Sequence, residues 1–283
     1  MYGFICIMAV VVQVFLATSI ASAAEKDWRI FGVQGTAKLI SASGAITPLT
    51  LEKNLLQPLS QGSRIKVEGR GKVVVVSIKS RLAFEILDES EALLEADQAR
   101  VLKGKVIPRK GYALPKGNEG RMGGIVMRGA GNTRSCLKAV SPLNTAILEL
   151  DPVLVWTNDC EVLKQVTITV LADDKTINTA ETSDTKYRIP AGILKPGNRY
   201  MWLIDGGSNF DMASGVFSIP AEPVLSEMLL KLNRKKTADI DDLVERIAFI
   251  YLLNEHGVID TARDESALLR KLYPGSEGLK ELP

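Results

Sequence analysis

Residue types that commonly do chemistry are scarce in this chain of 283 residues. His256 is the only histidine, so a Ser-His or Cys-His catalytic group would have to use it. It precedes Gly257 at the end of an apolar-periodic segment, where a cation stabilises the last carbonyls of a helix. We therefore expect His256 to cap a helix or lie on the surface.

The cysteines and the clustered acids do not form a recognisable metal motif. Cys6 lies in the apolar N-terminal segment, and the distant Cys136 and Cys160 lack the paired spacing of zinc ligands. A Cys136–Cys160 disulfide and two separate buried thiols are both compatible with the sequence. The acids of "DIDD" and "ADD" lack the glycine and distal glutamate of a calcium loop. We predict no metal and no cofactor.

One short segment matches a catalytic pattern by spacing alone. Ser183-Asp184-Thr185-Lys186 has the Ser-x-x-Lys form of penicillin-binding enzymes, in which the motif begins a helix and acts with two partner motifs. Here it lies between strand-like runs, and neither partner motif occurs. We therefore predict a protein without catalysis. The alternative is an enzyme with an unrecognised serine or acid site, which would need a pocket of carboxylates with perturbed pKa values.

Positive charge is concentrated in and just before a Gly-rich segment, residues 107–141, in which Glu119 is the only acid. Gly and Pro at this density are typical of a linker, and a solvated linker is one interpretation. The other is a flexible segment that contacts an anionic polymer. The predicted contacts are Lys103, Lys105, Arg109, Lys110, Lys116, Arg121 and Arg128. The net charge of +2 does not favour specific nucleic-acid binding.

Residues 1–23 have the pattern of a secretory signal peptide. An apolar run from Phe4 to Leu16 precedes Ala21-Ser22-Ala23, which fits a small-x-small cleavage site. The run is shorter than the roughly 20 residues of a membrane span. We expect a periplasmic or secreted protein, with membrane contact only if this segment is not cleaved.

Residues 24–106 predict a small all-β domain. Val73–Val76 is a continuous β-branched run, typical of a buried strand. The segments "GTAKLI", "LSQGSRI" and "KVVVVSI" resemble a FecR-like domain, and the resemblance extends from Gly35 to Val106. It implies a mainly β binding module.

Residues 142–220 predict a β-sandwich. Val166, Ile168 and Val170 alternate with threonines before a turn at Asp173-Asp174, which indicates a hairpin. The segment "LKPGNRYMWLI" resembles the Leu-x-Pro-x-x-x-Tyr segment of fibronectin type III-like and Ig-like domains. Alternation places Tyr200, Trp202 and Ile204 on one face of a strand. The resemblance implies that this face points inward, with Trp156 as its neighbour in the core.

Residues 221–283 predict helices. Apolar residues recur at helical spacing in "PVLSEMLLKLNRKK", "DIDDLVERIAFIYLLNEHG" and "DTARDESALLRKLYPG". The last two segments resemble one helix–turn–helix unit of a tetratricopeptide-like repeat. A single unit cannot bury its own apolar face. We therefore expect this hairpin to pack on a neighbouring domain or on a partner.

These patterns together predict a mainly β, multidomain protein: an all-β FecR-like domain, an Ig/fibronectin type III-like sandwich and a C-terminal helical segment. The predicted function is a non-catalytic binding or scaffold protein of the bacterial envelope, whose partner is an envelope protein or an anionic polymer. The alternative is an extracytoplasmic component of a FecR-type signal-transducing system. The sequence does not set the oligomeric state.

Overall fold

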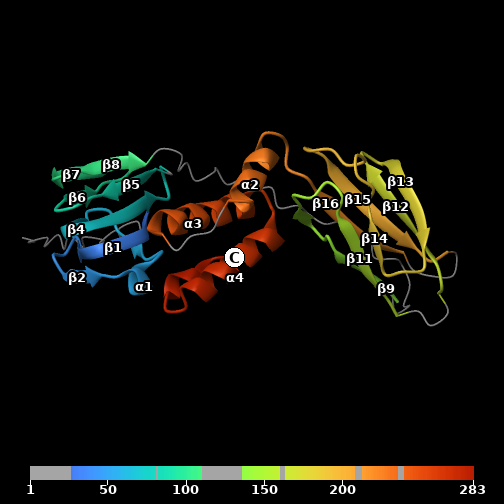
Figure 1. The fold of residues 1–283 in the computed structure, drawn as a ribbon, viewed down its shortest axis with the longest axis horizontal. Helices are drawn as coiled ribbons and strands as arrows, with labels where there is room; N and C mark the ends of the chain where they lie inside the picture. The colour runs from blue at the N-terminus through green and yellow to red at the C-terminus, as the bar shows by residue number, and fades with distance from the viewer. Residues whose placement is uncertain (1–26, 81, 110–135, 160–162, 208–211, 235–238) are drawn as a thin grey trace, which may run out of the picture.

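The structure is a computed structural model, and it describes residues 27–80, 82–109, 136–159, 163–207, 212–234 and 239–283. Two β modules lie at opposite ends of an elongated molecule, and the C-terminal helices lie between them (Figure 1). The spatial order of the parts therefore differs from their order along the chain. The prediction of a mainly β, multidomain fold with a helical C-terminal segment is confirmed.

The first module is built from eight strands and one short helix. These elements are β1 (Trp28–Ile40), β2 (Ile46–Leu49), α1 (Leu51–Asn54), β3 (Pro58–Leu59), β4 (Arg64–Ser77), β5 (Ala83–Ile86), β6 (Glu91–Leu94), β7 (Ala99–Lys103) and β8 (Val106–Arg109). The strand order is β2-β1-β4-β5-β8, with β3 paired to β1 and β6 joining β4 to β7. The inner faces of these strands enclose one apolar core.

Strand β4 is buried on both faces over Val73–Val76. Val73 and Val75 belong to the inner core of the first module, whereas Val74 and Val76 belong to the apolar cluster that includes the helices. Successive side chains of a strand point to opposite faces. A run of four valines therefore fits a sheet that is covered on both sides, as the continuous β-branched run predicts.

The second module is built from eight strands. They are β9 (Leu137–Ser141), β10 (Thr145–Ala146), β11 (Val153–Asn158), β12 (Val166–Ala172), β13 (Lys175–Thr182), β14 (Lys186–Arg188), β15 (Arg199–Asp205) and β16 (Ala213–Ser218). One sheet has the order β10-β16-β15-β12-β13 and the other has the order β14-β11-β9. Trp202 of the first sheet and Trp156 of the second are buried in one cluster, so the sheets pack face to face as a β-sandwich.

Strand β15 has the predicted inward face. Tyr200, Trp202 and Ile204 are at most 2% exposed, whereas the side chains between them are only half-buried. The Tyr200 hydroxyl accepts the Lys195 N–H at 2.7 Å and donates to the Lys195 carbonyl at 3.1 Å. Such a tyrosine bond fixes the chain at the entry to a sandwich strand. The aromatic residues of this segment are therefore core residues.

The C-terminal part contains α2 (Val224–Leu232), α3 (Ile240–Glu255), α4 (Ile259–Leu272) and the 3-10 helix η1 (Glu277–Glu281). Helix α3 ends at Glu255, and His256 caps it, with an N–H that donates to the Leu252 carbonyl at 3.2 Å. Gly257 follows in the left-handed region, with φ of 73°, as is common just after a helix. His256 is exposed, so its predicted place at a helix end is confirmed.

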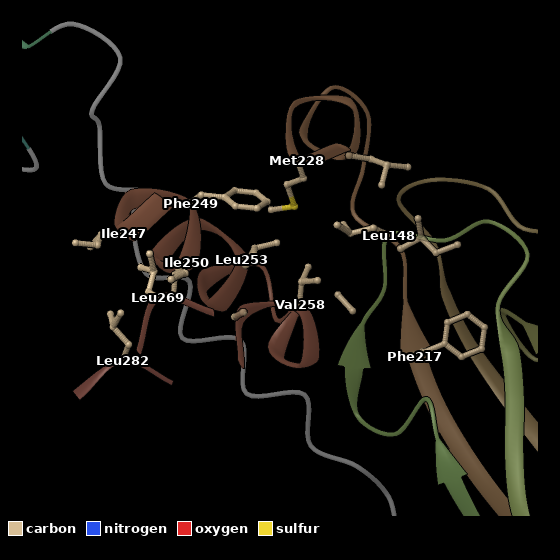
Figure 2. Packing of buried hydrophobic residues seen from close by; sticks show 14 of the residues in the cluster. Leu148, Phe217, Met228, Ile247, Phe249, Ile250, Leu253, Val258, Leu269 and Leu282 are labelled. Carbon is tan, nitrogen blue, oxygen red and sulfur yellow. The ribbon is translucent and has the colours of Figure 1, made fainter. Parts of the chain in front are cut away.

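Helix α3 is buried on more sides than its sequence pattern predicts. The expected apolar face contains Ile240, Val244 and Ile247, which are buried. Phe249, Ile250 and Leu253 are at most 5% exposed as well. The reason is that β1, α2 and α4 all contact α3. Figure 2 shows Phe249 of α3 beside Met228 of α2. The helical hairpin thus packs on neighbouring modules, as the sequence analysis expects.

Candidate functional site

The candidate catalytic residues lie apart from one another in the structure. His256 is exposed at the end of α3, and Ser183 lies in the turn between β13 and β14 rather than at the start of a helix. Within the described ranges, no three His, Cys, Asp or Glu side chains are grouped so that they could hold a metal ion. The absence of catalysis stays a prediction.

Cys136 is disulfide-bonded. Its backbone carbonyl accepts the N–H of Asp159 at 2.8 Å, next to the predicted partner in the sequence. Cys160 itself lies outside the described residues, so the Cys136–Cys160 bridge stays a prediction.

The structure separates the predicted anionic-partner contacts into three groups. Lys103 and Lys105 are exposed on either side of Gly104, at the turn from β7 to β8. Four predicted residues, Lys110, Lys116, Arg121 and Arg128, lie outside the described residues. Arg109 departs from the prediction, because its side chain is only 13% exposed and is occupied by carboxylates. It is therefore removed from the set of contacts.

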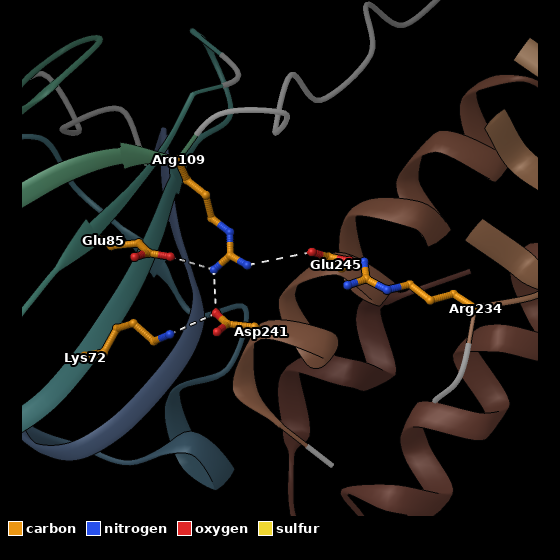
Figure 3. Close-up of polar contacts among 6 residues, drawn as sticks. All are labelled: Lys72, Glu85, Arg109, Arg234, Asp241 and Glu245. Atoms are coloured by element: carbon orange, nitrogen blue, oxygen red, sulfur yellow. Dashed lines mark hydrogen bonds and ion pairs between the residues drawn. The ribbon is translucent and has the colours of Figure 1, made fainter. Parts of the chain in front are cut away.

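Arg109 joins the first module to α3, in what we call the first junction. Its Nη1 donates to Glu85 Oε1 at 2.7 Å and to Asp241 Oδ1 at 2.8 Å. Lys72 Nζ donates to the same Asp241 oxygen at 2.8 Å (Figure 3). The carboxylate of Asp241, at the start of α3, is thus held by cations from β4 and β8.

Further charges extend this cluster along α3. Arg109 Nη2 lies 4.0 Å from Glu245 Oε1, and Glu245 also pairs with Arg234, which follows α2. Burial alone would raise the pKa of the Asp241 carboxyl, but the hydrogen bonds from Lys72 and Arg109 outweigh burial and hold that pKa below its ordinary value. The ionised form of Asp241 is therefore the one that the first junction stabilises.

Apolar packing lies beside the charges of the first junction. A Cβ at Gly32 of β1 would come within 2.8 Å of Ile240 Cγ1 and 3.2 Å of Val244 Cγ2. The backbone of β1 and the first turn of α3 therefore approach as closely as a glycine permits.

The second junction joins the helices to the sandwich. The Gly257 carbonyl, between α3 and α4, accepts the Ala146 N–H at 2.8 Å and the Thr145 hydroxyl at 3.1 Å. Around it, Met228, Val258 and Leu148 are buried in one apolar cluster with residues of both elements (Figure 2). This junction consists of apolar packing and hydrogen bonds to a single carbonyl.

A polar groove lies on the first module, between the α1–β3 connection and η1. Its volume is about 340 Å³, and its lining includes Lys53, Gln57, Pro58, Glu277 and Lys280. Leu56, at the base, has φ of 59° although it is 1% exposed. A bulky residue in the left-handed region is an outlier that the surrounding structure must hold in place.

Two arginines fix the walls of this groove. Arg29 Nη1 donates to the Leu56 carbonyl at 2.9 Å and to Glu281 Oε2 at 3.0 Å. Arg270 donates to the carbonyls of Leu279 at 3.0 Å and Leu282 at 2.6 Å. The C-terminal residues are thus tied to α4 on one side and to the first module on the other.

Sequence reasoning missed both the first junction and the groove. Arg109 reads as one more cation beside a basic linker, and nothing near it in the sequence indicates that Asp241 is its partner. The groove combines residues from the start and the end of the chain. A positive φ at Leu56 has no signal in the sequence, because leucine rarely adopts it.

None of the described helices is both long enough and apolar enough to cross a membrane.

Comparisons with known proteins do not show which family the chain belongs to. No family model matches it, and no curated protein matches it. One solved structure that it resembles is titled "Biofilm associated protein - BSP domain", with 12% identity and a TM-score of 0.22. The match covers 68% of this chain and 25% of that one, so the chain spans a quarter of that structure's length. A TM-score this low supports no inference about fold or function, and the FecR-like and tetratricopeptide-like resemblances stay predictions.

Proposed function

We propose that this protein is a non-catalytic binding or scaffold protein of the bacterial envelope, which holds two β modules in a fixed spatial relation. The observation that carries the proposal is the continuity of its core. One apolar cluster includes Phe31 of β1 and Val74 of β4, continues through α3 and α4, and reaches Phe217 of the sandwich. Such continuity is typical of a single rigid body rather than of modules on a flexible tether.

The ion pairs of the first junction add orientation to this apolar contact. Asp241 accepts from Lys72 of β4 and from Arg109 of β8, so α3 is held at two points of the sheet. Charge pairs of this kind contribute modestly to stability. Their value to a scaffold is geometric, since a directional bond sets the angle at which the module leaves the helix.

The proposed partners are an envelope protein or an anionic polymer. Lys103 and Lys105 are exposed at the end of the first module, just before the basic segment. Attraction between such a segment and a polyanion is long-ranged and is screened by salt. We expect binding to polyaspartate that weakens as salt rises and weakens further in the Lys103→Gln, Lys105→Gln double variant. Binding that ignores both changes would contradict the polymer as partner.

The scaffold itself is tested by measuring the distance between its two ends. Spin labels are placed at Lys103 and Lys175 through ketone-bearing side chains, which avoid the native cysteines. We expect one narrow distance distribution, because both labels lie on strand ends of a continuous body. A broad distribution would overturn the fixed relation. Turnover in a hydrolase screen that disappears on His256→Ala would overturn the absence of catalysis.

A further inference from the structure

The groove between α1 and η1 has the construction of a binding site rather than of a surface irregularity. A Cβ on Gly278 would overlap the Leu55 carbonyl oxygen, so η1 approaches the α1–β3 connection as closely as a glycine allows. Arg29 and Arg270 hold the two sides through hydrogen bonds to backbone carbonyls. The walls are therefore preformed, which lowers the entropic cost of binding a small molecule.

The backbone at the base of the groove is strained. Leu56 adopts φ of 59°, its N–H donates to the Ile30 carbonyl at 2.6 Å, and its carbonyl is taken by Arg29. Strained residues held by their surroundings occur preferentially at ligand clamps and active sites. This observation is independent of the shape of the groove, and it points to the same place.

Side chains of both charges surround the opening. The Lys53 ammonium is exposed and makes no ion pair with any residue in the described ranges. Glu277 lies 3.8 Å from Lys280, and both side chains are more than 70% exposed, so this pair is loose. Glu281, by contrast, is held by Arg29 at 3.0 Å and forms part of the wall.

We propose that this groove binds a small zwitterion, such as a free dipeptide, which carries an ammonium at one end and a carboxylate at the other. Lys53 receives its carboxylate and Glu277 receives its ammonium, while the Gln57 amide contacts the intervening peptide group. The volume of about 340 Å³ lies at the small end of the range for small-molecule sites, which suits a ligand of dipeptide size. The proposal stands apart from the scaffold function, since a rigid scaffold needs no ligand here.

The test uses the dipeptide Ala-Ala in four forms with the whole chain of 283 residues. The free dipeptide carries both charges, the N-acetyl form carries only the carboxylate, the amide form carries only the ammonium, and the doubly capped form carries neither. Amide chemical shifts are followed by NMR at low salt, up to about 10 mM ligand. We expect saturable shifts around Lys53 and Glu277 for the free dipeptide, and dissociation constants about threefold to tenfold higher for each singly capped form.

Variants assign each charge to its partner. Lys53→Gln is expected to weaken the free dipeptide to the level of the amide form, and Glu277→Gln to the level of the N-acetyl form. Both side chains are exposed, so the fold is expected to survive. Lys175→Gln and Glu149→Gln, on the distant sandwich, are the matched controls and are expected to bind as the parent does. The proposal is overturned by an absence of shifts, by equal binding of the doubly capped form, or by indifference to both groove variants.

Discussion

The two junctions of the helical segment are held together by different kinds of interaction. At the first junction, Asp241 accepts from Lys72 and Arg109 beside a close apolar contact between Gly32 and Ile240. At the second, the Gly257 carbonyl accepts from Thr145 and Ala146 amid buried apolar side chains. Packing and neutral hydrogen bonds respond less to salt and mild acid than do ion pairs whose carboxylate is partly exposed, as that of Asp241 is. The two ends of one molecule should therefore respond differently to the same solution.

The largest expected effect comes from removing apolar contact at the second junction. Met228 is fully buried, and Met228→Ala is expected to lower the free energy of unfolding by about 2–5 kcal/mol, because it leaves a cavity. Calorimetry should show the sandwich and the first module beginning to unfold separately. Met212→Ala is the control, since Met212 is 60% exposed, and it should change little. Equal effects of the two variants would show that Met228 does not join the parts.

Overpacking the first junction should give the next largest effect. In Gly32→Val the new side chain meets Ile240 and Val244, and the expected loss is about 1–3 kcal/mol by chemical denaturation. Adding Ile240→Ala restores room, so the double variant should lose less than the sum of the two single losses. Strict additivity would contradict the close contact.

A smaller effect is expected from the neutral hydrogen bond at the second junction. Thr145→Val removes the donor to the Gly257 carbonyl but keeps the shape of the side chain, and Thr145 is 3% exposed. We expect a loss of about 0.5–1.5 kcal/mol. Denaturation at low and high salt should give the same loss, and a loss that falls with salt would argue for an electrostatic contact instead.

The smallest effect is expected at the charged contact of the first junction. Asp241 is 45% exposed, so Asp241→Asn should cost no more than about 1 kcal/mol at neutral pH, and high salt should reduce the loss. Asp264→Asn, at an exposed position of α4, is the control.

The stability lost in Asp241→Asn should depend on pH, and the pKa of Asp241 gives the sign of that dependence. The pKa of Asp241 is lowered in the folded state from an ordinary value of 3.8. Its contribution is therefore complete above that ordinary value and is lost as the pH falls through the lowered folded pKa. Parent and Asp241→Asn proteins should converge in stability as the solution is acidified through this range. A difference that persists at the acid end would exclude the ion pairs as its source.

Local patterns predicted the elements well, because burial leaves a periodic trace in the sequence. The burial of the β4 valines, the alternation around Trp202 and the end of α3 just before Gly257 were all predictable from neighbouring residues. The two junctions could not be predicted in this way, because they depend on which surfaces of the elements meet. Asp241 and Arg109 lie in different modules of the predicted division, and their pairing has no local signal. The extra burial of Phe249 and Leu253 arises for the same reason, because several elements surround α3.

The position of the helical segment has a consequence for biosynthesis. It is made after both β modules, yet it lies between them (Figure 1). During synthesis each β module can fold as a unit before the helices that pack between the two modules have been made. Only when residues 240–283 have emerged can the two ends be joined. A chain that ends before these residues would thus contain two folded β modules joined only by the connecting segment.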